Sequence, residues 1–203
     1  MSITQTTARR RLFAGLGVTS VAVALGGIFV AASLSPWFSP FRNALSDLGA
    51  LGTATAPIFN GALMLGGALG AVFVAAVWAE ADEPMHVGGC FVLLLAMGFM
   101  ALVGVFPIPS PLHFVVALAF FVFLTLGVGI FGAGDFAAGR PVRGGTLVLG
   151  AVLHVVGWVW WLFFGWGGRG IAVPELVGSV VLAIWVVWVS VDLWPQRLDP
   201  ERL

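Results

Sequence analysis

Long apolar stretches separated by short polar segments run through almost the whole sequence. An α-helix needs about 20 apolar residues to cross a hydrocarbon core about 30 Å thick. Six stretches reach that length, at about 12–34, 56–79, 87–107, 112–135, 144–166 and 172–194. None shows the alternation of apolar and polar residues that is typical of a membrane β-barrel strand. The pattern predicts an all-α polytopic membrane protein, a six-transmembrane-helix bundle forming a single domain over residues 1–203.

The first apolar stretch has some features of a signal peptide. It follows three arginines at 9–11, and the small residues at 31–33 resemble a cleavage site. Its apolar run is longer than the 7–15 residues or so of a signal-peptide core. We therefore expect a retained transmembrane helix.

Composition supports the membrane class and excludes several others. Hydrophobic residues make up 60% of the chain, and charged residues 9%, against about 25% in soluble domains. Nine basic residues balance nine acidic ones, so the chain has no net positive charge that would attract nucleic acid. A single cysteine, Cys90, excludes a disulfide framework. No motif indicates a cofactor, and we expect none. The absence of lysine, with abundant alanine and glycine, suggests a prokaryotic source.

The arginines predict the orientation, because cytoplasmic loops are enriched in basic residues. With the N-terminus inside, the outer face holds only Arg42 and Arg169. The inner face then holds Arg9, Arg10, Arg11, Arg140, Arg143, Arg197 and Arg202. We therefore expect a multi-pass protein of the cell membrane with both termini in the cytoplasm. Trp37, Trp166 and Trp194 lie near span ends and suit interfacial anchors.

The first loop, residues 35–55, is long compared with the others. Ser39 and Pro40 suit the N-cap and first position of a helix, and Gly49 suits its end. We expect a short interfacial helix between them, lying flat at the outer surface or capping the bundle. Pro57 and Thr55 fit the start of the second span.

Glycines are abundant, with 28 in the chain. In lipid, small residues allow helix backbones to approach closely. Gly66 and Gly70 form a G-x-x-x-G pair in the second span, and Gly150 and Gly157 share a face of the fifth. These faces suit either packing within the bundle or a homo-oligomer interface.

Ionisable residues near membrane depth are candidates for function. On the predicted topology, polar residues from several segments meet on the outer side. This candidate site consists of Arg42, Ser46, Asp47, Asn60, His113, Arg169 and Glu175. Each also has an ordinary structural role open to it, such as a helix cap for Asp47 or a favourable first-turn acid for Glu175.

Several chemistries remain open for this cluster. One histidine and two carboxylates suit a divalent metal or an acid–base pair, although we assign no metal ligand. Ser46 would be a nucleophile only if His113 approached it. Arg42 and Arg169 would suit a clamp on a phosphate or carboxylate head group. Catalytic residues are therefore not assigned from the sequence.

His154 forms a separate candidate site, near the middle of the fifth span and about 15 Å deep. It suits either a neutral imidazole bonded to another helix or a proton-relay or ligand-binding role. The aromatic run 158–164 suits packing and lipid contact, or a slot for a lipid or isoprenoid tail. At the inner side we interpret His86, Asp135 and Asp192 as interface charges. Asp135 would pair with Arg140, and Asp192 with Arg197.

Short motifs give a family resemblance. The stretch Asn43-Ala-Leu-Ser-Asp-Leu-Gly49, then Phe59-Asn-Gly61, Val105-Phe-Pro107 and Pro111-Leu-His113 resemble a large prokaryotic six-span family, common in archaea and actinobacteria and described only as a domain of unknown function. This resemblance covers about 35–194. The Ser-Asp-x-Gly piece is also similar to DRAM/Frag/Sfk-type membrane proteins, through one short motif and topology. Neither family implies a catalytic mechanism. The motif positions are Ser46, Asp47, Gly49, Asn60, Pro107 and His113.

These observations lead to one functional expectation and two alternatives. We expect an integral membrane protein that binds or organises lipid, or a lipid-linked ligand, at the outer polar cluster. The alternatives are a membrane-embedded hydrolase or transferase that uses Asp47, His113 and Glu175, and a small transporter or accessory subunit. The expected partners are the lipid bilayer and such a ligand, with a homo-oligomer or larger membrane complex left open and nucleic acid excluded.

Overall fold

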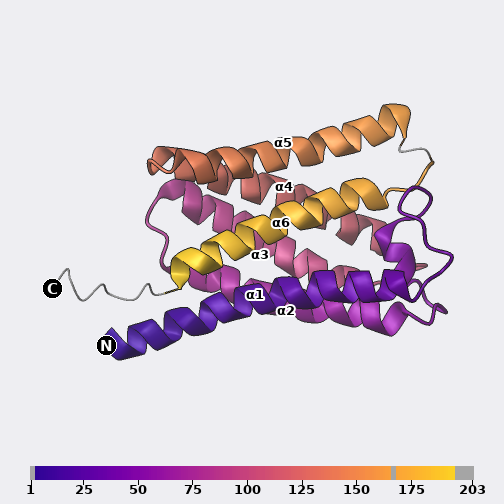
Figure 1. Cartoon of the computed structure of the whole chain (residues 1–203), viewed down its shortest axis with the longest axis horizontal. Helices are drawn as coiled ribbons and strands as arrows, with labels where there is room; N and C mark the ends of the chain where they lie inside the picture. Colours follow the sequence, from indigo (N-terminus) through magenta and orange to yellow (C-terminus); the bar gives the residue numbers. More distant parts are fainter. Residues whose placement is uncertain (1–2, 166–167, 195–203) are drawn as a thin grey trace.

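The computed structural model describes residues 3–165 and 168–194, and these residues form six long helices and one short one (Figure 1). The six are long and apolar enough to cross a membrane. They are α1 (Ile3–Ser33), α2 (Ala56–Ala79), α3 (Pro84–Val105), α4 (His113–Ala137), α5 (Pro141–Phe164) and α6 (Ala172–Leu193). The predicted all-α, six-span architecture is confirmed, and the molecule is a multi-pass membrane protein.

The predicted spans coincide closely with the helices, because apolar length leaves few other solutions in a bilayer. The largest difference is at α1, which begins at Ile3 rather than near residue 12. Its extra turns carry Arg9 and Arg10, which form ion pairs with Glu80 just beyond α2. The basic residues thus continue the helix instead of preceding it.

Successive helices pack as neighbours, and α6 completes the bundle by contacting α1, α4 and α5 (Figure 1). The core consists of side chains from all six helices, with Phe73 and Trp185 in edge-to-face contact at its centre. α5 lies at the margin, and its main packing partners are α4 and α6. Many side chains of α5 are therefore exposed on the bundle surface.

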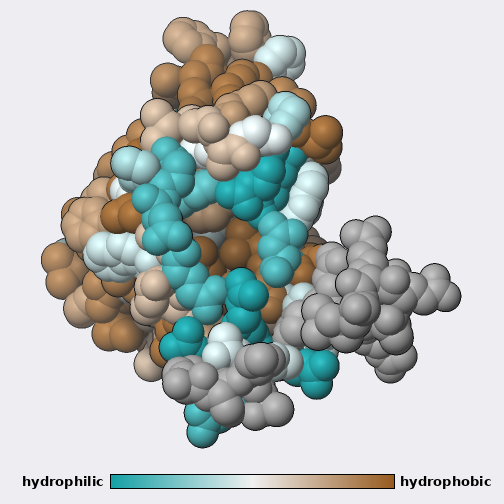
Figure 2. Space-filling model, turned by 90° about the vertical axis from the view of Figure 1, so that its left-hand side faces the viewer, coloured by the Kyte–Doolittle hydropathy of each residue, from teal (hydrophilic) through white to brown (hydrophobic). Residues whose placement is uncertain are grey.

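The two ends of the bundle differ. α1 begins and α6 ends at one end, here called the terminal end, together with the turns at 80–83 and 138–140. Hydrophilic residues gather across this end, with apolar flanks beside them (Figure 2). The opposite end, the cap end, carries the loops 34–55, 106–112 and 165–171. Trp37 and Trp194 are exposed at opposite ends, whereas Trp166, Arg197 and Arg202 lie outside the described residues.

The glycine pair of α2 packs inside the chain. A Cβ atom added at Gly67 would lie 2.7 Å from the Ala101 nitrogen of α3, and one at Gly66 would lie 2.9 Å from Ala24 of α1. A Cβ atom added at Gly70 would lie 2.5 Å from the Met97 sulfur. This face therefore brings α1, α2 and α3 into close contact, while oligomer formation stays a separate prediction.

The predicted helix from Ser39 to Gly49 is wrong in its extent. Residues 40–43 form a turn, and only Leu45–Gly49 form a short 3-10 helix, η1. Ser39 does not cap it; instead the Ser39 N–H donates to the Asn43 side chain, and the Ala44 N–H donates to Asp47. Buried Leu45 and Leu48 turn η1 onto the bundle, so it caps the helices rather than lying free.

Candidate functional site

The first loop ties distant helices together at the cap end. Its backbone accepts hydrogen bonds from the start of α6 and the loop before it. The Gly170 N–H donates to the Phe41 carbonyl and the Ala172 N–H donates to the Asn43 carbonyl, both at 3.0 Å. It also donates from Leu51 N–H to Ile108, in the loop before α4, at 2.8 Å. The loop 34–55 is therefore a backbone clasp across all three loops of the cap end.

Two carboxylates hold neighbouring amides of this clasp. Asp47 accepts from the Ala44 N–H at 3.0 Å and from the Asn43 side chain at 3.1 Å. Glu175, from the first turn of α6, accepts from the Leu45 N–H at 2.6 Å. The structure thus brings together two predicted site residues that are separated by most of the sequence, and both stabilise the fold of the clasp.

Asn60 and Ser46 are held at the same end. The Asn60 amide donates to the Gly49 carbonyl at 2.8 Å, which links α2 to η1. Ser46 is buried within η1. Thr55 precedes α2 as predicted, but its hydroxyl donates to the Leu48 carbonyl rather than capping the helix. The Asn60 and Thr55 side chains thus bind backbone carbonyls of η1.

His113 is placed apart from the carboxylates. Its Nδ1 lies 2.8 Å from the Phe106 carbonyl, so the ring closes the turn between α3 and α4. Among the described residues His113 makes no hydrogen bond or ion pair with Ser46, Asp47 or Glu175. No three histidine, cysteine or acidic side chains in the described part of the chain are grouped so that they could hold a metal ion. Neither the hydrolase hypothesis nor the metal hypothesis is therefore supported by a contact between these side chains.

Arg42 and Arg169 lie next to each other at the rim of the cap end. Arg169 stands between Gly168 and Gly170, and a Cβ atom at Gly170 would lie 2.5 Å from the Arg42 nitrogen. Glycine is therefore required on both sides for the two loops to touch. Both arginine side chains are exposed. The Gly-Gly-Arg-Gly sequence was the signal for this close approach.

A groove opens between α4 and α5 on the side of the bundle. At the terminal end the two helices touch, because a Cβ atom at Gly144 would lie 2.7 Å from the Gly132 carbonyl. Towards the cap end the helices diverge (Figure 1), where Phe121 and Trp158 meet in edge-to-face contact at 5.8 Å. The volume of this groove is about 560 Å³.

The groove joins two of the predicted sites. Its lining runs along α4 from Phe114 to Leu126, about 18 Å at the helical rise per residue. Glu175 lines it from α6, and His154 lines it from α5. Exposed Leu118 and Leu126 stand at its edge, so it is open to the bilayer along its side.

His154 has a hydrogen-bond partner on each ring nitrogen. Thr125 gives its own proton to the Phe121 carbonyl, so its oxygen accepts from His154 Nδ1 at 2.7 Å. The Trp158 indole donates to His154 Nε2 at 2.8 Å. Both bonds are satisfied by a neutral ring protonated on Nδ1. A Cβ atom at Gly178 would lie 2.5 Å from Nε2, so this glycine makes room for the ring.

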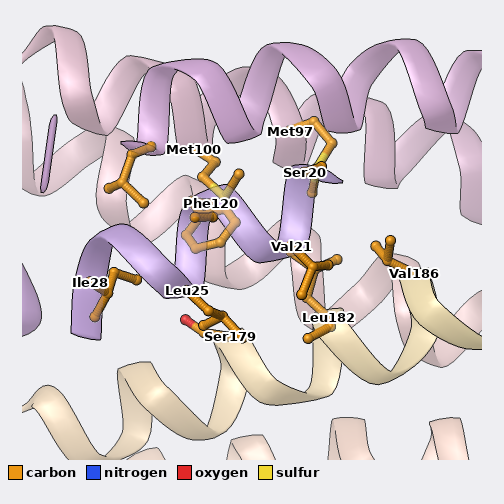
Figure 3. A pocket seen from close by; sticks show the side chains of 13 residues that line it. Ser20, Val21, Leu25, Ile28, Met97, Met100, Phe120, Ser179, Leu182 and Val186 are labelled. Carbon is orange, nitrogen blue, oxygen red and sulfur yellow. The ribbon is translucent and has the colours of Figure 1, made fainter. Parts of the chain in front are cut away.

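A second, small cavity lies between α1, α3 and α6 (Figure 3). Its volume is about 40 Å³, little more than the space of one water molecule. Ser20 and Ser179 on its wall already donate to helix carbonyls. It is far smaller than the groove between α4 and α5.

The terminal end contains a polar cluster that the sequence interpretation missed. Asp135 is fully buried, and its carboxylate binds Arg143 at 2.5 Å and His86 at 3.0 Å. The predicted pairing with Arg140 is confirmed at 3.3 Å. Asp192 pairs with Arg143, and its predicted partner Arg197 lies outside the described residues.

The interpretation of His86 and Asp135 as interface charges is therefore wrong. Their side chains lie inside the bundle and join α3, α4 and α5, and Asp192 adds α6. A Cβ atom at Gly134 would lie 2.8 Å from the His86 ring, so this glycine admits the histidine. The available signal was the position of Asp135 and Arg143, which stand within the helices rather than beyond them.

Comparison with known proteins identifies the family but no activity. The family model described as "Protein of unknown function (DUF998)" matches residues 7–192. No curated protein and no solved structure matches the chain. Because the match extends over nearly all six helices, the chain belongs to the DUF998 family of membrane proteins of unknown function.

Proposed function

We propose that this protein binds one apolar chain of a lipid, or of a lipid-linked ligand, in the groove between α4 and α5, with the ligand's polar head at the cap end. The groove itself supports this proposal. It is a single space with aromatic walls that runs from the clasp to the middle of the bundle.

The size of the groove suits one chain. A volume of about 560 Å³ corresponds to on the order of 20 groups the size of a water molecule, at about 30 Å³ each. A methylene group is of similar size, so one long acyl or prenyl chain is the natural occupant. Phe114, Phe121 and Trp161 supply flat apolar walls, which suit both saturated and isoprenoid chains.

The polar atoms along the groove agree with an apolar occupant. Thr125 and His154 bind each other, so they offer no unsatisfied group to a ligand at mid-depth. Polar contacts would be made only at the cap end, where Glu175 lines the groove and Arg42 and Arg169 are exposed at the same end of the bundle. A continuous polar path for a transported ion is not formed by these residues.

Native mass spectrometry of the protein in mild detergent, combined with one pair of variants, tests this function. Leu126 and Leu65 are both leucines with 52% of their surface exposed, but only Leu126 lines the groove. Leu126→Trp should fill the groove and remove most of the co-purified lipid, while Leu65→Trp on α2 should leave it bound. Equal lipid retention by both variants, or no retained lipid in the unaltered protein, would contradict the proposal.

A further inference from the structure

We infer that Glu175 selects the head group of the groove's ligand, and that this head group is a primary amine attached to the apolar chain. The inference rests on the proposed function, because it requires a chain in the groove. Glu175 is the residue at which the groove meets the clasp.

The Glu175 carboxyl has one oxygen in use and one to spare. Oε2 accepts from the Leu45 N–H at 2.6 Å. Within the described residues, Oε1 makes no hydrogen bond. The side chain is only 4% exposed, yet it lines the groove. Oε1 is not sealed inside the protein, since Glu175 lines the groove. An oxygen without a partner in an apolar space is costly, and a donor at the top of the groove would satisfy it.

An ionised Glu175 carboxylate would have no counter-ion among the described residues. In the described part of the chain no arginine or histidine forms an ion pair with it, whereas Asp135 at the other end has three basic partners. A second carboxylate is close by, because Asp47 accepts from the Ala44 N–H and Glu175 accepts from the next amide, the Leu45 N–H. A buried carboxylate without a cation is unfavourable, and an ammonium group on the ligand would compensate it.

An amine meets both needs at once. An ammonium group donates up to three hydrogen bonds and carries a positive charge, so one group would satisfy Glu175 Oε1 and balance the carboxylate. Its chain would then extend past Phe121 towards His154. A carboxylate or phosphate head at the same place would meet Glu175 and Asp47 with like charge. An alcohol would satisfy the hydrogen bond but leave the charge.

Three photoreactive probes with the same 16-carbon chain and different heads test the inference: hexadecylamine, hexadecanol and palmitic acid, each with a diazirine on the chain. Cross-linked peptides are mapped by mass spectrometry. The amine should label the α4 and α5 segments at concentrations about tenfold below those needed for the alcohol or the acid, as expected from one charge-assisted hydrogen bond. Phosphatidylethanolamine is added as a competitor, with phosphatidylcholine as the control. If phosphatidylethanolamine competes, a two-chain lipid can supply the amine; if it does not compete, the ligand is a single-chain amine.

Glu175→Gln is the matching variant. The glutamine keeps an oxygen for the Leu45 N–H but loses the charge, so the amine preference should fall to about twofold or less while labelling of the groove persists. Glu80→Gln, at the terminal end, is the control and should keep the preference.

The outcomes separate the two proposals. Equal labelling by all three heads, an alcohol as good as the amine, or a preference for the acid overturns the inference about Glu175 but leaves a lipid chain in the groove. No cross-link in α4 or α5 with any probe overturns the proposed function as well. If the glutamine variant does not fold, the order of the three probes on the unaltered protein still decides.

Discussion

Asp135 shows how a charge can be accommodated inside an apolar bundle. Its carboxylate has no exposed surface, and Arg143, His86 and Arg140 surround it. Arg143 in turn lies over the Phe131 ring at 5.8 Å and is itself buried. Each charge is therefore tolerated only while its partner is present, and the removal of one partner leaves the other uncompensated.

The residue prediction follows from this dependence. Asp135→Asn should lower the free energy of unfolding by about 3 kcal/mol, because the Arg143 guanidinium would stay buried with less opposing charge. The measurement is unfolding in detergent, by SDS titration or heating. Asp82→Asn changes an exposed aspartate at the same end and should have little effect. Equal stability of the two variants would show that the cluster does not stabilise the bundle.

At the scale of elements, glycine placement decides where helices touch and where they separate. Gly67 lets α2 approach α3, and Gly132 and Gly144 join α4 to α5 near the terminal end. Towards the cap end no such glycine pair joins α4 to α5, and aromatic side chains stand between the two helices and line the open groove. The groove is thus a consequence of how small and large residues are distributed along α4 and α5.

A pair of glycines on the same helix tests this view. Gly67→Ala would place a methyl group 2.7 Å from the Ala101 nitrogen, and such overpacking should destabilise the protein by about 1–3 kcal/mol. Gly61→Ala meets nothing within 4 Å, so it should leave stability unchanged or raise it by up to about 1 kcal/mol through reduced backbone entropy. Melting temperatures in one detergent compare the two. A Gly67→Ala variant as stable as the Gly61→Ala variant would contradict the packing argument.

For the whole molecule, the architecture could be predicted from the sequence because a bilayer accepts little besides apolar helices of fixed length. The span limits of α2 and α6 were predicted within a residue. The site was predicted only in part. Asp47 and Glu175 do meet on one clasp, but His113 binds a different turn.

The missed features share a physical cause. The contact of His86 with Asp135 joins residues 49 positions apart, and the groove depends on the angle between two helices. Hydropathy reports how deep a residue lies but not which neighbour it faces. Likewise Ser39 and Pro40 have the residue types of a helix start, yet the Asn43 side chain takes the Ser39 N–H and holds a turn there.

Orientation in the membrane is a prediction that labelling can decide. Cys90 is the single cysteine and is buried, so Cys90→Ala gives a background for introduced thiols. Ala54→Cys in the clasp and Ala138→Cys at the terminal end place a thiol at exposed positions on opposite ends. If the basic terminal end is cytoplasmic, a membrane-impermeant maleimide should label only the first in intact cells and both after permeabilisation. The reverse pattern would invert the topology.

The clasp at the cap end also has a consequence for synthesis. Leu45 and Glu175 are 130 positions apart, so the ribosome makes the clasp well before its α6 partner. Until α6 is in place, the Leu45 N–H lacks its Glu175 acceptor, and the Phe41 and Asn43 carbonyls lack the Gly170 and Ala172 donors. The cap end therefore closes completely only after all the intervening helices have been made. A chain truncated before α6 would leave the Leu45 N–H without its carboxylate partner.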